Sequence, residues 1–569
     1  MDNLKQQLVL ASKSGELLSI ARELYFSEKE ERDNLSQALA SLHNAGKINV
    51  ITEFQKKHDF FMNRHILEGT LPLITEPVSN VMECVRYLTL EAGHDMAAGI
   101  IISPFIEFMS ADERRPEEVL RIALNAVDEQ LDFIAPALLA GTKLNLLKYL
   151  PQAIELSQHA NAHIRIRATQ ALGRIQYNEK SNLVSDAVTA IEFTVSGNFD
   201  ELLFASALRT SYSLYNQDSA IEHRVINILK VILKHHDDHI LCIASEILFL
   251  ETDIPKTIVD ILLNALTHTK PINKGTLDNI DHGLERLIKR SETESVINFL
   301  EHILLDAREI SITQFDSLCH AITSDSNILN AIITRWLLSK KVRLGRCAAD
   351  LLPMGSERGI PLEADYQQLE GLTEDTYIFL ARKACGWFFM HQISATSFIL
   401  SLIDKIPEAD HQEITKILFN PLLISFPGSV KEHLENALEN ASDRKASIIN
   451  QAVEQFDEYH KGLKDAYSIK ELQPSEAHKE MHYRRHARLM SESQEQADKH
   501  SIWRQITTML LYGSKYIHYI KNGPEGQSTR QETPLQHFSY SIEFPLLDNL
   551  DHNGLEHMLR HFRLEGCSS

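Results

Sequence analysis

The chain has 569 residues, and 43% of them are hydrophobic, so it carries enough apolar side chains for a folded core and is not a disordered protein. Its 57 Lys and Arg face 78 Asp and Glu, which gives a net charge of −21 at pH 7. A strongly acidic surface repels phosphate groups and disfavours non-specific attachment to DNA, RNA or anionic lipid. The low numbers of glycine and proline, 22 and 17, favour long helices with short connections over many short strands.

The cysteines and the first residues indicate the compartment. The six cysteines are scattered without a C-x-x-C pair, and most lie in apolar helical stretches, where Cys acts as a small hydrophobic residue. This usage is typical of a reducing compartment. The N-terminus lacks a basic segment followed by a long apolar run, so we expect no signal peptide and a cytoplasmic location.

Residues 1–75 are predicted to form three helices and to act as an N-terminal helical cap. The three segments are GELLSIARELYFS, EKEERDNLSQALASLHNAGKI and TEFQKKHDFFMNRHILEGTLPLI. Charged and apolar residues mix evenly in them, as in a terminal element that keeps one face in water while the other packs on its neighbour.

Residues 76–355 carry the most informative feature, a helical stripe of apolar residues that recurs at a nearly fixed period. In HIRIRATQALGRI the stripe consists of Ile164, Ala168, Ala171, Leu172 and Ile175. With this copy included, the stripes start at positions 131, 164, 201, 240, 280, 315 and 344, which lie 33, 37, 39, 40, 35 and 29 residues apart. The second position is Ala or Cys in most copies, as close packing of helices favours. Self-similarity at this period is typical of stacked helical hairpins.

The segment HIRIRATQALGRI resembles the second helix of a HEAT repeat, with Arg165 and Arg167 ahead of an A-x-x-A-L-G run. The other copies keep the spacing but not the letters. The resemblance implies an all-α fold, an α-solenoid of HEAT- or armadillo-like helical hairpins over residues 76–355. Such arrays usually bind other molecules. The alternative is an irregular helical domain whose helices have similar lengths by chance.

A basic cluster lies at a junction in this array, in the segment TRWLLSKKVRLGRC. Its members are Arg335, Lys340, Lys341, Arg343 and Arg346. Beside Trp336 on one face of a solenoid, these cations would suit a nucleic acid or an acidic peptide. Ordinary ion pairing between neighbouring repeats explains the same residues, and it is the interpretation that we favour.

Residues 356–455 follow a stretch rich in Pro and Gly and are predicted to form a further helical region without a clear period. Within it, residues 384–403 contain no Asp, Glu, Lys or Arg, and the segment is long enough to span a bilayer. The polar letters HQISATS at its centre predict a buried helix–loop–helix joint instead. We therefore expect no membrane partner.

Residues 456–569 are predicted to form a charged helix followed by a β-hairpin, together a small α+β C-terminal module. Alternation of aromatic and β-branched residues predicts strands over Lys515–Ile520 and His537–Phe544. The charged helix holds Arg484, Arg485 and Arg488 near aromatic residues, a combination that suits nucleic acid. Acidic residues interrupt this basic run, so we favour a solvated helix with i, i+4 charge pairs.

The same helix carries imidazoles at every fourth position, His478, His482 and His486. Histidines one turn apart can share a zinc ion. The three neighbouring arginines repel a cation, so we expect no metal.

A row of polar residues marks the predicted second strand. His537, Ser539, Ser541 and Glu543 share one face of it, and a pocket over them would make a general acid–base site. An ordinary half-exposed strand shows the same alternation. The sequence has no Walker motif, no Rossmann glycine motif, no H-E-x-x-H and no G-x-S-x-G, so catalysis is not indicated.

We interpret the chain as a non-catalytic helical-repeat scaffold that binds a protein partner within a larger assembly and needs no cofactor. One alternative is a nucleic-acid-binding solenoid subunit of a bacterial defence system, antiviral in purpose, or of a DNA-processing system. Another is an enzyme with its site in the C-terminal module. A continuous positive groove joining Arg335–Arg346 to Arg484–Arg488 would favour the first alternative, and a pocket over the polar row the second. A uniformly negative concave face would favour a basic protein partner.

Overall fold

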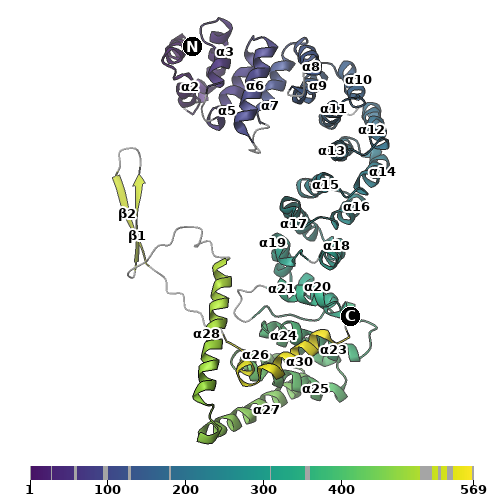
Figure 1. Ribbon diagram of the computed structural model, residues 1–569, viewed down its shortest axis with the longest axis vertical. Coiled ribbons are helices and arrows are strands. Elements are labelled where there is room, and N and C mark those ends of the chain that lie inside the picture. The colour runs from purple at the N-terminus through teal and green to yellow at the C-terminus, as the bar shows by residue number, and fades with distance from the viewer. Residues whose placement is uncertain are drawn as a thin grey trace. The chain divides into compact units, whose positions relative to one another are not determined.

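The computed structural model describes residues 2–26, 29–56, 60–93, 100–125, 130–178, 181–307, 309–352, 359–499, 515–522, 527–534 and 543–566. In this part of the chain almost all regular structure is helical, which confirms the predicted all-α class. The chain divides into two compact units, Met1–Arg286 and Leu287–Ser569. Figure 1 shows helix following helix along the chain, coloured from purple at the N-terminus to yellow at the C-terminus.

The first unit is built of helices with short connections. It begins with α1 (Asp2–Ser14), α2 (Leu17–Tyr25), α3 (Lys29–Asn44), α4 (Val50–Phe54), α5 (Phe60–Thr70), α6 (Val78–Ala92), α7 (Ile102–Ser110) and α8 (Arg115–Asn125). It continues with α9 (Ile134–Leu144), α10 (Leu146–Leu156), α11 (Ala162–Arg174), α12 (Ser181–Ser196), α13 (Glu201–Gln217), α14 (Glu222–Leu233), α15 (Asp238–Leu250), α16 (Lys256–Leu266) and α17 (Lys274–Lys289), whose last residues belong to the second unit. The prediction of three helices in residues 1–75 is wrong: it omits α1 and joins α4 to α5.

Helices of the first unit pack both on the next helix and on the next but one. In one row, α9 contacts α7 and α11, and α13 contacts α11 and α15. The intervening helices form a second row, in which α14 contacts α12 and α16. Contacts of α10 with α11, of α12 with α13 and of α15 with α16 join the two rows.

The sequence starts three helices of the first row in the same way. Asn161, Asp200 and Asp237 precede α11, α13 and α15 in extended conformation, and their side chains accept hydrogen bonds from backbone N–H groups of the first turn. Such N-caps satisfy donors that have no partner within the helix. They fix where each helix begins and therefore which of its residues face the neighbouring helices.

The recurring apolar stripe lies on alternate helices. Its seven copies fall on or directly before α9, α11, α13, α15, α17, α19 (Asp316–Ser324) and α21 (Val342–Leu351). Ala168 of α11 and Ala244 of α15, the small residues of two stripes, are both 0% exposed. Their predicted burial is confirmed.

Two helices of the first row come very close at Gly173, in the A-L-G run of α11. A Cβ atom added at Gly173 would lie 2.9 Å from the Cα atom of Thr210 on α13, closer than packed side chains tolerate. The hydroxyl of Thr210 also donates a hydrogen bond of 2.8 Å to the carbonyl of Thr169. The absence of a side chain at Gly173 thus allows α11 and α13 to approach closely, and the buried hydrogen bond from Thr210 holds them together.

The second unit is helical as well. Its helices, besides α19 and α21, are α18 (Thr293–Asp306), α20 (Ser326–Leu338), α22 (Tyr366–Leu369), α23 (Asp375–Trp387), α24 (Gln392–Leu402), α25 (His411–Ile417), α26 (Ser429–Ala437), α27 (Asp443–Ser468), α28 (Glu476–Lys499), α29 (Leu546–Leu550) and α30 (His552–Leu564). Residues 384–403 form the end of α23, a short loop and α24, mostly buried, which agrees with the predicted helix–loop–helix joint. No helix among the described residues is long and apolar enough to cross a membrane.

The last helix, α30, packs on α23 of the same unit. Lys383 of α23 is almost completely buried, and its ammonium group donates a hydrogen bond of 2.7 Å to the carbonyl of Arg563, 180 residues later in the sequence. Arg563 in turn donates from Nε to the carbonyl of Gly386, at 2.6 Å. Buried charged donors require such acceptors. The end of the chain is therefore part of the core of the second unit.

A two-stranded antiparallel ribbon lies between α28 and α29 in the sequence. It consists of β1 (Lys515–Asn522) and β2 (Gln527–Pro534), and Lys515 is opposite Pro534. The first strand agrees with the prediction, but β1 pairs with β2 and not with the predicted partner, His537–Phe544, of which residues 537–542 lie outside the described residues. A short connection loses less entropy on closure than a long one, so the nearer segment pairs with β1 although its composition is polar.

We predict opposite effects of alanine at two glycines of the first unit. Gly173→Ala should lower the free energy of unfolding by about 1–3 kcal/mol, because the new methyl group meets the backbone of α13. Gly275→Ala, in α17, should be neutral or stabilising, because no atom lies within 4 Å of its added Cβ and alanine favours the helix. Urea denaturation followed by circular dichroism measures both. Equal effects of the two substitutions would contradict the close contact at Gly173.

Candidate functional site

A groove with a volume of about 760 Å³ lies over α11, α13 and α15 in the first unit. We call it the α11–α15 groove. The described side chains that line it include His163, Arg167, Arg174, Leu202, Arg209 and Ile243. They belong to three successive helices of one row, so the groove follows from the packing of that row.

The helical period that builds the core also lines the groove. Four of the six described lining residues of α11 are spaced by four, three and four residues: His163, Arg167, Gln170 and Arg174. Four of the six on α13 have the same spacing: Leu202, Ser206, Arg209 and Ser213. The other lining residues, Ile166, Gly173, Ala205 and Thr210, are each adjacent to one of these positions. This spacing selects one face of a helix, next to the face that carries the buried stripe.

The described lining includes three arginines and two histidines, and none of its members is Asp or Glu. Arg167 pairs with Asp132, which is not part of the lining, and Arg209 pairs with Glu251 at 3.2 Å. The side chain of Arg174 is exposed and has no hydrogen-bond or ion-pair partner among the described residues. The groove is therefore cationic in a chain whose net charge is −21.

Apolar and neutral polar groups lie between these cations. Leu202 is 43% exposed, and Ile243 of α15 is half-buried beside Cys242. The amide of Gln170 donates a hydrogen bond of 3.2 Å to the hydroxyl of Ser206, which joins α11 to α13 across the groove. A concave surface that combines apolar area with few polar groups is typical of a binding site.

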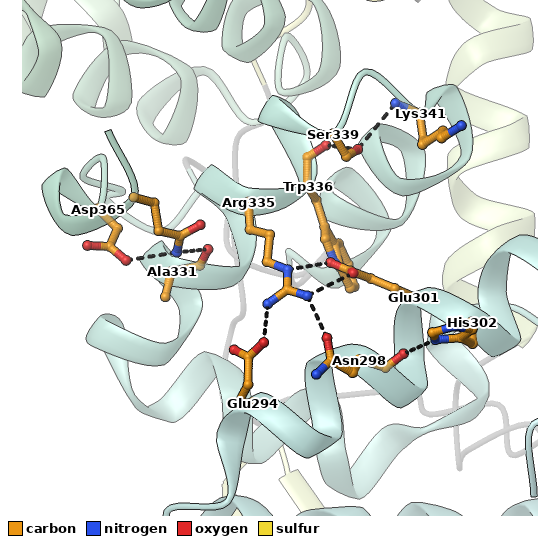
Figure 2. Close-up of polar contacts among 11 residues, drawn as sticks. Glu294, Asn298, Glu301, His302, Ala331, Arg335, Trp336, Ser339, Lys341 and Asp365 are labelled. Carbon is orange, nitrogen blue, oxygen red and sulfur yellow. Dashed lines mark hydrogen bonds and ion pairs between the residues drawn. The ribbon is translucent and has the colours of Figure 1, made fainter. Parts of the chain in front are cut away.

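Arg335, the first residue of the predicted basic cluster, ties two helices together. Its guanidinium donates through Nε to Glu301 at 2.7 Å, and through its other nitrogens to Glu294 and Asn298 of α18 (Figure 2). Burial disfavours the charge, but the hydrogen bonds to Glu301 and Glu294 outweigh burial and raise the pKa of Arg335. Trp336 is 0% exposed and belongs to the core, so it does not form a surface with the cluster.

Two further members of this cluster also contact the protein itself. Arg343 donates hydrogen bonds to the carbonyls of Leu304 and Ile310, where α18 ends. Arg346 forms a long ion pair of 3.9 Å with Asp350, one turn further along α21. Arg343 thus contacts the end of α18 through backbone carbonyls, whereas the ion pair of Arg346 lies within α21.

The two lysines of the cluster are exposed. Lys340 has a positive φ of 58°, and its ammonium lies 5.6 Å from the ring centroid of Phe379. It lines a cavity of about 740 Å³ together with Arg382 and Glu565. Because Arg382 and Glu565 form an ion pair of 2.8 Å, the charge of this cavity is mixed.

The three arginines of α28 each have an acceptor. Two of them pair along the helix at i, i+4: Arg484 with Glu480 at 2.6 Å and Arg488 with Glu492 at 3.6 Å. The third, Arg485, contacts Asp548 at 3.1 Å and so joins α28 to α29. Exposed pairs of this kind are the solvated, charge-paired helix that the sequence favoured.

The remaining predicted groups are only partly described. His478 lies on α28, but the side chains of His482 and His486 lie outside the described residues, as do His537, Ser539 and Ser541. In the part of the chain that is described, no group of three or more His, Cys, Asp or Glu side chains could hold a metal ion.

Glu543, the last residue of the predicted polar row, has a structural role. Its carboxylate accepts hydrogen bonds from the backbone N–H groups of Gly428 at 2.7 Å and of Ser429 at 2.9 Å, and from the Ser429 hydroxyl. These donors lie at the start of α26, where unpaired N–H groups and the helix dipole favour an anion. Glu543 thus fastens the segment before α29 to α26.

A comparison of the sequence with models of known protein families and with curated proteins found no match. We therefore infer the function of the chain from the residues of the groove.

Most groove residues are not among those that the sequence patterns singled out. Arg167 belongs to the HEAT-like motif, but no sequence pattern assigned it a role in binding. A usable sequence signal is the set of positions beside the apolar stripe. At these positions Arg174 and Arg209 lie on the side of α11 and α13 that faces away from the repeat contacts. A basic or apolar residue that recurs beside a repeat stripe marks the surface that stacking leaves open.

We predict that Arg335 contributes to stability. Arg335→Met should lower the free energy of unfolding by about 1–3 kcal/mol, because Glu301 keeps its charge in a partly buried place without its partner. Adding Glu301→Gln should recover part of this loss, because the uncompensated charge is removed. Urea denaturation measures all three proteins. Arg346→Met, which removes only a long surface pair, is the control, and a loss as large for Arg346 as for Arg335 would contradict the prediction.

Proposed function

We propose that this chain is a non-catalytic helical-repeat scaffold that binds a protein partner within a larger assembly, with the partner seated in the α11–α15 groove. The observation that carries the proposal is the groove of about 760 Å³, formed by three successive helices of one row. Concave surfaces with apolar area and a few convergent polar groups are where proteins bind their ligands.

The packing of the first unit supports a solenoid of stacked helical hairpins. Its helices form two rows in which neighbours of the same row touch. Polar contacts recur between residues 31 to 36 positions apart, namely Lys143 with Glu107, Lys148 with Glu117, Arg224 with Glu192 and Lys270 with Asp238. This separation lies close to the period of the apolar stripe, as expected when equivalent positions of adjacent repeats meet.

The use of the groove residues supports a binding role. Arg174 is exposed, and Leu202 keeps 43% of its surface in water although it lies in a concavity. Neither residue contributes a contact that the core requires. Covering the exposed leucine with an apolar side chain of a partner is favourable, because apolar surface leaves water.

A protein partner is favoured over a nucleic acid because the arginines of the two predicted basic clusters already have acceptors within the protein. Arg335 is held by Glu301 and Glu294, and the arginines of α28 contact carboxylates. Affinity for nucleic acid depends on the number of phosphates that free cations neutralise, so paired arginines contribute little. The net charge of −21 opposes phosphate binding further.

We also propose a cytoplasmic location. The described cysteines Cys84, Cys242, Cys319, Cys347 and Cys385 are free thiols. Free thiols are typical of a reducing compartment.

We predict that Leu202→Asp abolishes partner binding while the fold remains. Leu202 is the second residue of α13, where an acidic side chain is compatible with the helix dipole. The tagged full chain is used to recover proteins from native lysate, with and without nuclease, and quantitative mass spectrometry measures the partner. Recovery should fall by about tenfold or more for the variant, as for a residue at the centre of an interface.

The matched control is Leu147→Asp. Leu147 is likewise the second residue of its helix, α10, and is 68% exposed, but it does not line the groove. This variant should recover the partner as well as the unmodified chain does. Equal recovery by both variants would contradict the assignment of the groove, and loss of the partner on nuclease treatment would favour the nucleic-acid alternative.

A further inference from the structure

We infer that the segment bound in the α11–α15 groove is an acidic stretch of a protein chain that also presents an apolar side chain. This inference rests on the proposed function and specifies the chemistry of the partner at the same site. It follows from three properties of the groove: its sign of charge, the arginine donors in it that lack a protein acceptor, and the absence of Phe, Tyr and Trp from its described lining.

The described lining of the groove carries a net positive charge. The groove is lined by arginines from two neighbouring helices, α11 and α13, and by His163 and His239, and no carboxylate belongs to its described lining. Two of the three arginines already have partners, Asp132 for Arg167 and Glu251 for Arg209. A net positive charge remains at Arg174. A partner with carboxylates therefore meets a complementary potential, whereas a basic partner is repelled.

The second property is the presence of donors that lack an acceptor. Arg209 Nη1 is shielded from solvent and has no hydrogen-bond partner among the described residues, although its neighbour on the same guanidinium pairs with Glu251. A buried donor left without an acceptor, as at Arg209, is unfavourable in a native protein. Arg174 likewise has no partner among the described residues, but it is exposed, so water solvates its donors and a ligand can reach them. A carboxylate of a bound segment is an acceptor of the right charge for Arg174, and its bonds to arginine are strong.

The surface around Arg174 extends beyond the groove. Arg174 also lines an adjacent hollow of about 400 Å³, together with Leu139 and Lys143 of α9. Lys143 pairs with Glu107 at 2.6 Å, so this neighbouring hollow adds little net charge. Arg174 therefore lines both the α11–α15 groove and the adjacent hollow of the same unit. An extended segment that crosses it would reach from α9 to α15.

The side chains that line the groove favour an acidic peptide over a nucleic acid. None of the described residues that line the groove is Phe, Tyr or Trp, so the imidazoles of His163 and His239 are the only rings among them on which a base could stack. Its apolar groups, Leu202 and Ile243, are aliphatic and suit an aliphatic or aromatic side chain of a peptide. One unpaired arginine is too little to hold a phosphate backbone, which requires several neutralised phosphates. The observations thus favour the peptide.

The test is a selection of random peptides by display on the full-length chain, with removal of all peptides that also bind the Leu202→Asp variant. The peptides that remain depend on the groove. We expect them to be enriched in Asp and Glu around one apolar residue. Their affinity, measured by fluorescence anisotropy with labelled synthetic copies, should fall by about tenfold for Arg174→Glu, because one close charge contact becomes repulsive.

The matched control is Arg121→Glu. Arg121 is an exposed arginine of α8 that does not line the groove, so this variant changes the net charge of the chain equally. Peptide affinity should remain within about twofold of that of the unmodified chain, since exposed charges far from the groove are screened by salt. Circular dichroism confirms that each variant is folded.

The outcomes separate this inference from the proposed function. Groove-dependent peptides without acidic enrichment, or with equal affinity for the Arg174→Glu variant, would overturn the inference and leave the scaffold in place. A selection that yields no groove-dependent peptide would contradict both. A parallel selection of random single-stranded DNA that yields groove-dependent binders would overturn the peptide as the ligand.

Discussion

The close approach of α11 to α13 is the constraint on which the groove depends. A helix pair packed this tightly tolerates no side chain at Gly173, whose added Cβ would meet the backbone at Thr210. The bond from Thr210 to the carbonyl of Thr169 fixes the axial register of the two helices. Because register and distance are fixed, the residues on the solvent side are fixed as well. Arg174 is therefore brought beside Arg209 on one concave surface, although Arg174, unlike Arg209, has no polar partner of its own among the described residues.

Charged residues have two different uses in this chain. Many of them join neighbouring helices, as Arg335 joins α20 to α18 and Arg224 joins α14 to α12. Partly buried cations of this kind are satisfied by carboxylates, so they contribute to the packing and offer little to a ligand. Arg174 is different, because it lies beside the apolar stripe and has no such carboxylate in the described residues. The contrast identifies the groove more clearly than the number of basic residues does.

The sequence predicted those parts of the fold that depend on local periodicity. The stripe of Ala168 and Ala244 is a property of single helices, and it identified alternate helices from α9 to α21. Contacts between distant segments left no such pattern. The packing of α30 on α23 joins residues 180 positions apart through the buried Lys383. No pattern in the sequence near Lys383 predicts this contact. The partner of β1 was mistaken for the same reason, since composition favoured a distant aromatic segment over the nearer polar one.

The candidate site was harder to predict than the fold. Clusters of basic residues in the sequence suggested Arg335 and Arg484 as binding residues. Whether their charge is available to a ligand depends on their partners in the folded structure. The groove combines single residues from three helices, each unremarkable in its own segment.

The most direct measurement is hydrogen–deuterium exchange of the full chain, alone and in complex with the partner that co-purifies with it. If the partner binds in the α11–α15 groove, exchange should slow on binding in α11, α13 and α15, with little change in α18, α20 and α28. Protection centred on α28 or on the segment from Arg335 to Arg346, with none in α11 to α15, would contradict binding in the groove.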